Sequence, residues 1–322
     1  MSTSLRALLS EVLDYAGLFP PAGLPLEEAL RNYARYRQQP ENWLLGRFVC
    51  PAGRLEELSP WVEELFSGDN PLLLSLLGTG GKTSQQFLAN LKNDLFVLAK
   101  FRVRHREMVA ADVYEVRLPE EITSAGRKEP VATLLEAAAP ILKNHWVGPL
   151  TPFYEAGFEE GWRSSLPAIL GGIAQARSSG AWAGFKLRCG GLKADAFPST
   201  EQVALVLAAC REEGIPWKAT AGLHHPLRYS DPGIGTTMHG FVNVFGAGVL
   251  AHARHPGPEI LRKILEEEDA GNFHFGDNDF RWQNLQVATA EITAARREGV
   301  TSFGSCSFEE PCADLRNLGW LC

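Results

Sequence analysis

The sequence lacks the features that mark membrane-spanning, secreted and nucleic-acid-binding chains. It has no run of about 18 apolar residues, so we expect no membrane-spanning helix. The amino-terminal stretch mixes acids with its apolar residues, which does not fit a secretory signal peptide. The formal net charge is −7, and the densest cationic stretch, residues 100–106, is typical of a solvated helix face. We therefore predict neither a membrane nor a nucleic-acid partner.

Paired cysteines and cofactor motifs are also missing. None of the six cysteines forms a C-x-x-C pair, and this usage fits a reducing cytoplasm rather than a disulfide framework. The stretch "LLGTGGKT" (residues 76–83) resembles a phosphate-binding loop, but Leu76 stands where that motif requires its first glycine. We expect an ordinary loop there, and we predict no cofactor.

What the chain does have is enough apolar sequence for one large core. It has 322 residues, of which 45% are hydrophobic and 21% charged. It shows no internal repeat and no low-complexity linker, so we predict a single domain over residues 1–322. Helical apolar spacing over residues 4–14 and 25–37 predicts two helices, in an amino-terminal extension covering residues 1–43.

After this extension, short apolar runs alternate with helical patterns. Eight runs are expected as strands, at residues 45–51, 71–78, 111–119, 146–155, 181–189, 215–222, 272–277 and 301–308. Ser199 and Gln202 form a capping box that predicts the start of one helix. Eight strand–helix units predict parallel strands, and the simplest architecture is a (β/α)8 barrel. A doubly wound open sheet is the alternative fold.

Two of these strands carry a lysine inside an apolar run, in "GFKLRCGG" (Lys186) and in "IPWKATAG" (Lys218). Both lie near the carboxyl ends of their strands, where barrel active sites form. Two neighbouring cations in a dry site would lower each other's pKa, and an amine with a lowered pKa can form a Schiff base with a carbonyl compound. The same lysines would also suit ion pairs or an anion site.

Further candidates lie at other strand ends. Arg188 has the same strand parity as Lys186 and would clamp a carboxylate or phosphate. Glu155 ends the fourth predicted strand and could act as an acid or base, and Glu115 could neutralise a buried lysine. His224 is a candidate acid–base group, and His225 and His239, in the same long loop, are candidate substrate contacts.

Three short motifs resemble those of the deoxyribose-phosphate aldolase group of class I aldolases: "FKLRCGG" (185–191), "WKATAGL" (217–223) and "FGSCS" (303–307). That resemblance implies a barrel lyase in which Lys186 forms the Schiff base and Lys218 lowers its pKa. It also implies that Gly304, Ser305 and Ser307 help to hold a phosphate. The sequence leaves open whether Lys218 is the nucleophile instead.

Three functions follow from these residues. The first is a lysine-dependent lyase of the aldolase type acting on a small anionic carbonyl compound, with or without a phosphate and without a metal. The second is a metal-dependent hydrolase or isomerase that uses His224, His225 and His239, with Asp277 as a further ligand. The third is a barrel that binds an anionic metabolite without catalysis. The sequence leaves the substrate and any homo-oligomer open.

Overall fold

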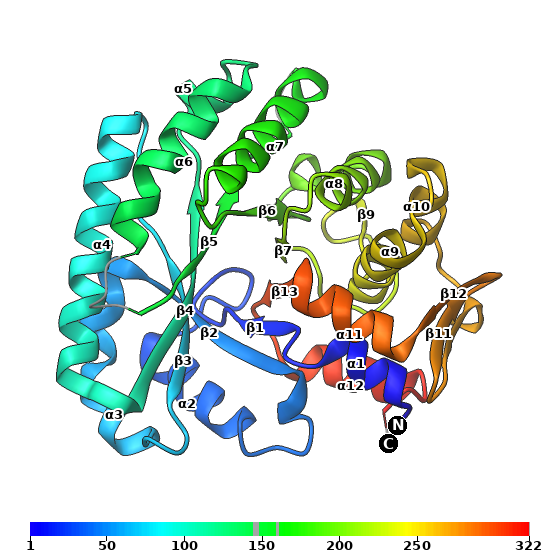
Figure 1. Cartoon of the computed structure of the whole chain (residues 1–322). Coiled ribbons are helices and arrows are strands. Elements are labelled where there is room, and N and C mark those ends of the chain that lie inside the picture. Colours follow the sequence, from blue (N-terminus) through cyan, green and yellow to red (C-terminus); the bar gives the residue numbers. More distant parts are fainter. Residues whose placement is uncertain (144–147, 159–160, 322) are drawn as a thin grey trace. The chain divides into compact units, whose positions relative to one another are not determined.

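The fold is a closed, eight-stranded parallel β-barrel with alternating helices, in a computed structural model that describes residues 1–143, 148–158 and 161–321 (Figure 1). The strand order around the barrel is β1-β13-β7-β6-β5-β4-β3-β2. The barrel strands are β1 (Leu13–Tyr15), β2 (Leu45–Pro51), β3 (Leu72–Leu77), β4 (Val109–Arg117), β5 (Thr151–Glu155), β6 (Gly184–Arg188), β7 (Trp217–Thr220) and β13 (Val300–Ser305). The predicted (β/α)8 barrel is confirmed.

The described residues contain helices of very different lengths. The α-helices are α1 (Thr3–Leu9), α2 (Leu26–Tyr36), α3 (Ser59–Leu65), α4 (Ser84–His105), α5 (Glu120–Thr123), α6 (Lys128–Leu142), α7 (Trp162–Ser178), α8 (Thr200–Glu212), α9 (Phe241–Arg254), α10 (Pro258–Leu265), α11 (Thr289–Glu298) and α12 (Glu309–Asn317). The 3-10 helices are η1 (Asn42–Leu44), η2 (Ala52–Leu58), η3 (Arg106–Met108), η4 (Ala194–Ala196) and η5 (Ala270–Asn272). The capping box of Ser199 and Gln202 begins α8 as predicted.

The chain divides into two compact units, which we describe separately. One consists of residues 14–42 and 47–186, and the other of residues 1–13, 43–46 and 187–322. In the first unit α6 packs against α4 and α7, and these helices run side by side outside the strands (Figure 1). In the second unit α10 packs against α8 and α9, and α11 packs against α1 and α9.

The amino-terminal extension is shorter than predicted. It consists of α1 alone, because the helix ends at Leu9 and the chain enters the first barrel strand at Leu13. Glu11 turns the chain with a φ of 49°, and the backbone N–H of Phe303 on β13 then bonds to the carbonyl oxygen of Val12. A strand of three residues is too short to show an alternating pattern, so its apolar residues look like one more turn of helix.

The predicted seventh strand, residues 272–277, is wrong as a barrel strand. Its strand part, β10 (Phe273–Phe275), pairs antiparallel with β11 (Asp279–Trp282), which pairs with β12 (Leu285–Ala288) outside the barrel. The helix expected to follow it starts only at Thr289, because β11 and β12 occupy its first half. A second small sheet pairs β8 (Tyr229–Asp231) with β9 (Thr236–Met238) in the loop after β7.

The remaining predictions differ mainly at element ends. The strand expected at residues 146–155 is β5, which begins at Thr151, and residues 146 and 147 lie outside the described residues. The single helix expected after β2 is η2 followed by α3, with Pro60 in the first turn of α3. In the corrected order Lys186 lies on the sixth barrel strand and Lys218 on the seventh, each one strand later than predicted.

Candidate active site

The alternation of side chains along β4 and β5 shows which face of the sheet carries the candidate site. The Tyr114 hydroxyl donates to Asp94 of α4 at 2.9 Å, and the Tyr154 ring packs against Phe87 of the same helix. Both tyrosines therefore face the surrounding helices. Because successive strand residues point to opposite faces, the next residue on each strand, Glu115 or Glu155, faces the inside of the barrel.

Lys186 reaches the same inner face and contacts both carboxylates. Its Nζ lies 3.1 Å from Oε2 of Glu115 and 2.9 Å from Oε2 of Glu155. The side chains are 6%, 3% and 10% exposed, respectively. Glu155 and Lys186 meet on the inner face because they are direct pairing partners across β5 and β6. We call Lys186, Glu115 and Glu155 the lysine–carboxylate cluster.

The charge state of Lys186 differs from the sequence-based expectation. Burial pulls the pKa of Lys186 down, but the carboxylates of Glu115 and Glu155 outweigh burial and hold the pKa above its usual value. The expected lowering of the pKa is therefore wrong for this lysine. The amine rests as an ammonium, and it becomes nucleophilic only when a proton is transferred away from it.

The sequence does not predict one residue of this site, Ser75, and predicts another, Glu115, only as a charge partner. Ser75 of β3 is fully buried, and its hydroxyl donates to Oε1 of Glu115 at 2.5 Å. The available signal was a lone serine among the leucines of "LLLSLL". Glu115 itself was expected only to neutralise a lysine, whereas it contacts both Ser75 and Lys186.

The other predicted strand-end residues belong to the second unit. Lys218 is completely buried on β7, and Arg188 is the exposed last residue of β6. The ends of three strands meet here, because the Cys189 N–H donates to the Thr220 carbonyl oxygen and Gly304 pairs with Thr220 across β13 and β7. The structure therefore brings the ends of the three motifs together within this unit.

Glycine is required where the chain leaves β6 and β7. Gly222 has a φ of 70°, and a Cβ atom there would lie 2.8 Å from both the Cys189 carbonyl oxygen and the Gly190 Cα. Any side chain would push these two backbone segments apart. The turn "CGG" and the turn "AGL" can therefore touch only because their glycines carry no side chain.

The serines of "FGSCS" form a closed turn. The Ser305 hydroxyl donates to the Ser307 carbonyl oxygen at 2.8 Å and accepts from the Ser307 N–H at 3.3 Å. The Ser307 hydroxyl accepts from the N–H of Glu310 in the first turn of α12. These bonds fix the loop between β13 and α12.

The three histidines predicted as site residues lie in two different environments. His224 Nδ1 lies 3.1 Å from Glu310 Oε2, and His225 Nδ1 lies 2.5 Å from Asp314 Oδ2, so both contact α12. His239 is fully buried, and its Nε2 lies 2.8 Å from the carbonyl oxygen of Pro198. Burial lowers the pKa of His239 to about 4, so its imidazole is neutral at pH 7.

The loop that carries His224, His225 and His239 forms no metal site among the described residues. Within residues 1–143, 148–158 and 161–321, no group of three or more His, Cys, Asp and Glu side chains is placed to hold a metal ion. Asp277, proposed as a further ligand, accepts instead from the N–H and hydroxyl of Thr3. The side chains of His224 and His225 each contact a carboxylate, and that of His239 contacts a carbonyl oxygen.

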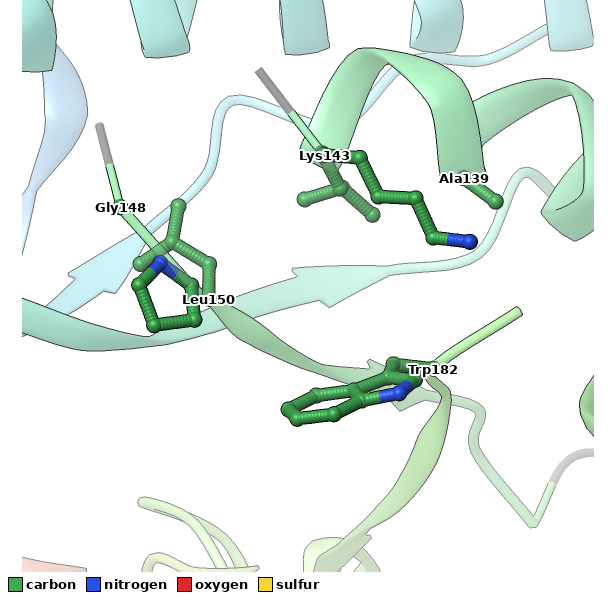
Figure 2. A pocket seen from close by; sticks show the side chains of 7 residues that line it. Ala139, Lys143, Gly148, Leu150 and Trp182 are labelled. Carbon is green, nitrogen blue, oxygen red and sulfur yellow. The ribbon is translucent and has the colours of Figure 1, made fainter. Parts of the chain in front are cut away.

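A hollow in the first unit lies away from the lysine–carboxylate cluster. It has a volume of about 450 Å³ and is lined by Ala139, Leu142, Lys143, Gly148, Pro149, Leu150 and Trp182. Figure 2 shows the Lys143 chain and the Trp182 ring on two sides of it. Leu150 and Trp182 precede β5 and β6, so this hollow lies at the amino ends of strands whose carboxyl ends carry Glu155 and Arg188. Barrel active sites form at the carboxyl ends.

Cys50, Cys189, Cys210, Cys306 and Cys312 are all free thiols. No helix of the described chain is long and apolar enough to cross a membrane.

Comparison with known proteins does not assign the chain to a family, so its class rests on the fold and the site. No protein-family model matches the chain, and a search of curated proteins finds no match either. The fold and the site define a (β/α)8 barrel with a buried lysine held between two glutamates.

Proposed function

We propose that the protein is a lysine-dependent lyase of the aldolase type, in which Lys186 forms a Schiff base with a small anionic carbonyl compound. The observation that carries this proposal is the contact of one buried ammonium with two carboxylates, at 3.1 and 2.9 Å, on the inner face of the barrel. A carboxylate beside the amine can take its proton, and the second negative charge balances the positive iminium that follows.

The chemistry balances with the groups of the lysine–carboxylate cluster. The ammonium gives a proton to a carboxylate, and the neutral amine attacks the carbonyl carbon. The carbonyl oxygen leaves as water, and an iminium remains on Lys186. A carboxylate then takes the proton of a hydroxyl group on the carbon β to the iminium, the C–C bond breaks, and its electron pair forms an enamine. Protonation of the enamine carbon and addition of water release the second product.

The aldolase resemblance supports the same assignment. In the corrected order Lys186 and Lys218 lie on the sixth and seventh barrel strands, the strands on which the deoxyribose-phosphate aldolase group carries its two lysines. Arg188 is a cation two residues from Lys186 and would bind the anionic group of the substrate. Gly304, Ser305 and Ser307 stay candidate phosphate contacts, and His224, His225 and His239 stay candidate acid–base or substrate contacts.

Binding of an anion without catalysis fits Lys186 less well. An anion placed at its Nζ would lie beside the carboxylates of Glu115 and Glu155, which would repel it. The metal-dependent alternative has no ligand group in the described residues that favours it. A location in a reducing cytoplasm and assembly into a homo-oligomer remain predictions.

The test of the function is hydrogen exchange on the carbon next to a carbonyl group. Acetaldehyde, pyruvate and other small aldehydes and keto acids are incubated with the protein in D2O and followed by NMR. An enzyme that forms an enamine exchanges this hydrogen for deuterium. We expect exchange with at least one compound, and loss of that exchange in Lys186→Arg, which keeps the charge but forms no Schiff base. Equal exchange by both proteins would contradict the proposal.

A further inference from the structure

Both carboxylates contact Lys186, and Glu115 also accepts a hydrogen bond from Ser75. Glu115 uses both oxygens, since Oε1 accepts from Ser75 at 2.5 Å and Oε2 contacts Lys186 at 3.1 Å. Glu155 lies closer to the lysine, at 2.9 Å, and its side chain is 10% exposed, against 3% for Glu115. The more buried carboxylate is therefore the one that receives the serine hydroxyl.

The stagger of the barrel strands explains why Ser75 reaches Glu115. Ser75 is the pairing partner of Val113, which lies two residues before Glu115 on β4. Glu115 in turn pairs with Phe153, two residues before Glu155 on β5. In a barrel with tilted strands, inward side chains on neighbouring strands meet across such an offset. Ser75, Glu115 and Glu155 therefore follow one another around the inner face.

A hydroxyl that donates to a carboxylate favours its charged form. In a buried site this bond is stronger than in water, because the surroundings have a low dielectric constant. The Ser75 hydroxyl and the Lys186 ammonium both donate to Glu115, so a proton on this carboxylate would remove the negative charge that strengthens both bonds. Glu155 is the nearer carboxylate and the one more open to solvent.

We propose that Ser75 is a positioning residue that keeps Glu115 ionised, so that Glu155 is the carboxyl group that takes up and returns the proton of Lys186. This inference rests on the proposed Schiff-base function. In the first step an N–H bond of the ammonium breaks and an O–H bond forms on Glu155. After the amine has attacked the carbonyl carbon, Glu155 returns this proton to the oxygen that leaves as water. Glu115 carries the same charge throughout and balances the iminium.

The test compares four proteins: the wild type, Ser75→Ala, Glu155→Gln and the double variant. Acetaldehyde and pyruvate are supplied separately with sodium cyanoborohydride, and the rate of adduct formation on Lys186 is followed by mass spectrometry. We expect Glu155→Gln to form the adduct about 100-fold more slowly, since it removes the proton acceptor. Without the Ser75 hydroxyl, Glu115 can accept the proton, so the double variant should be roughly tenfold faster than Glu155→Gln.

The faster adduct formation expected in the double variant distinguishes a positioning role of Ser75 from a structural one. Loss of packing at Ser75 can only slow the Glu155→Gln protein further, whereas a change of proton acceptor makes it faster. A double variant as slow as Glu155→Gln, or slower, would overturn the inference.

A second measurement needs no substrate. Glutamate carboxyl carbons are labelled with 13C and titrated by NMR, and the signals of Glu115 and Glu155 are assigned from their Gln variants. We expect Glu115 to take up a proton at lower pH than Glu155, and to do so at higher pH in Ser75→Ala. An unchanged Glu115 titration in Ser75→Ala would overturn the role of Ser75. Absence of any adduct in the wild type would instead count against the Schiff-base function.

Discussion

The lysine inside the apolar strand β6 is explained by residues of β5 and β4, the next two strands around the barrel. Lys186 is 5% exposed, and its ammonium lies between Glu115 and Glu155. A buried charge without a partner costs several kcal/mol, so the three residues depend on one another. The same contacts that allow the lysine to be buried also give it an acceptor for its proton.

Removing the lysine should therefore destabilise the protein strongly. Lys186→Ala takes away the cation that both glutamates contact, and we expect a loss of about 3–5 kcal/mol in the free energy of unfolding at pH 8. In the variant the folded state favours protonated glutamates, so the deficit should shrink as the pH falls to 5. Urea unfolding at both pH values measures this, with Lys186→Arg as the control that keeps the charge. A deficit that does not change with pH would contradict the account.

His239 makes the stability of the fold sensitive to acid. Its Nε2–H donates to the Pro198 carbonyl oxygen, and its buried Nδ1 has no hydrogen-bond partner among the described residues. Its pKa of about 4 lies below the ordinary 6.5, so between these values the unfolded chain binds a proton that the folded chain does not. Stability should fall by roughly 3 kcal/mol from pH 7 to pH 4 through this group.

His239→Gln is the matched variant for this prediction. It keeps a donor for Pro198 and has no group that titrates in this range. We expect the difference in unfolding free energy between wild type and variant to shift by roughly 3 kcal/mol in favour of the variant as the pH falls from 7 to 4. Parallel pH profiles would show that His239 is not the responsible group.

At the scale of single residues, the sequence could show unusual polar residues but not their partners. Lys186 and Glu155 stand out because each interrupts or ends an apolar run. Ser75 gives a weaker signal, since a lone serine in a strand is common in solvent-facing positions as well. Its contact with Glu115 depends on the register of β3 and β4, which is set by packing of the whole barrel.

At the scale of the elements, the contact of α6 with α7 depends on one glycine. A Cβ atom on Gly172 would lie 2.5 Å from Val131 Cβ and 2.7 Å from the Lys128 carbonyl oxygen. Gly172→Ala must move the two helices apart, and we expect it to cost about 1–3 kcal/mol. The neighbouring Gly171→Ala is the control, because its Cβ would lie at ordinary distances of 3.7 and 3.8 Å from the Lys128 side chain.

The control should be neutral or stabilise α7 by up to about 1 kcal/mol, since alanine favours helix more than glycine does. Thermal unfolding of both variants measures the difference. If Gly172→Ala were as stable as Gly171→Ala, the close packing of α6 on α7 at this glycine would be refuted.

Elements with many residues were predictable, and short ones were not. The apolar spacing of residues 25–37, which contain α2, and the capping box of α8 give periodic or positional signals that tertiary contacts do not alter. β1 has three residues and no readable alternation, so its apolar residues extend the helical pattern before it. The strands β10, β11 and β12 resemble helix or barrel strand because each has only three or four residues.

At the scale of the whole molecule, the errors in β1 and β10 cancelled in the strand count. Eight strands were expected and eight close the barrel, but one predicted strand lies outside it and one true strand was missed. The correction moves Lys186 and Lys218 to the sixth and seventh strands. Closure of the sheet supports the proposed function, because it gives Glu115, Glu155 and Lys186 an inner face shielded from water.

The most direct test of this account is to trap the Schiff base itself. The protein is mixed with acetaldehyde or with pyruvate, reduced with sodium borohydride and analysed by intact-mass spectrometry and peptide mapping, alongside Lys186→Arg and Lys218→Ala. We expect an increase in mass equal to one reduced adduct, located on Lys186, absent from Lys186→Arg and kept in Lys218→Ala. An adduct located on Lys218, or no adduct with any aldehyde or keto acid, would contradict it.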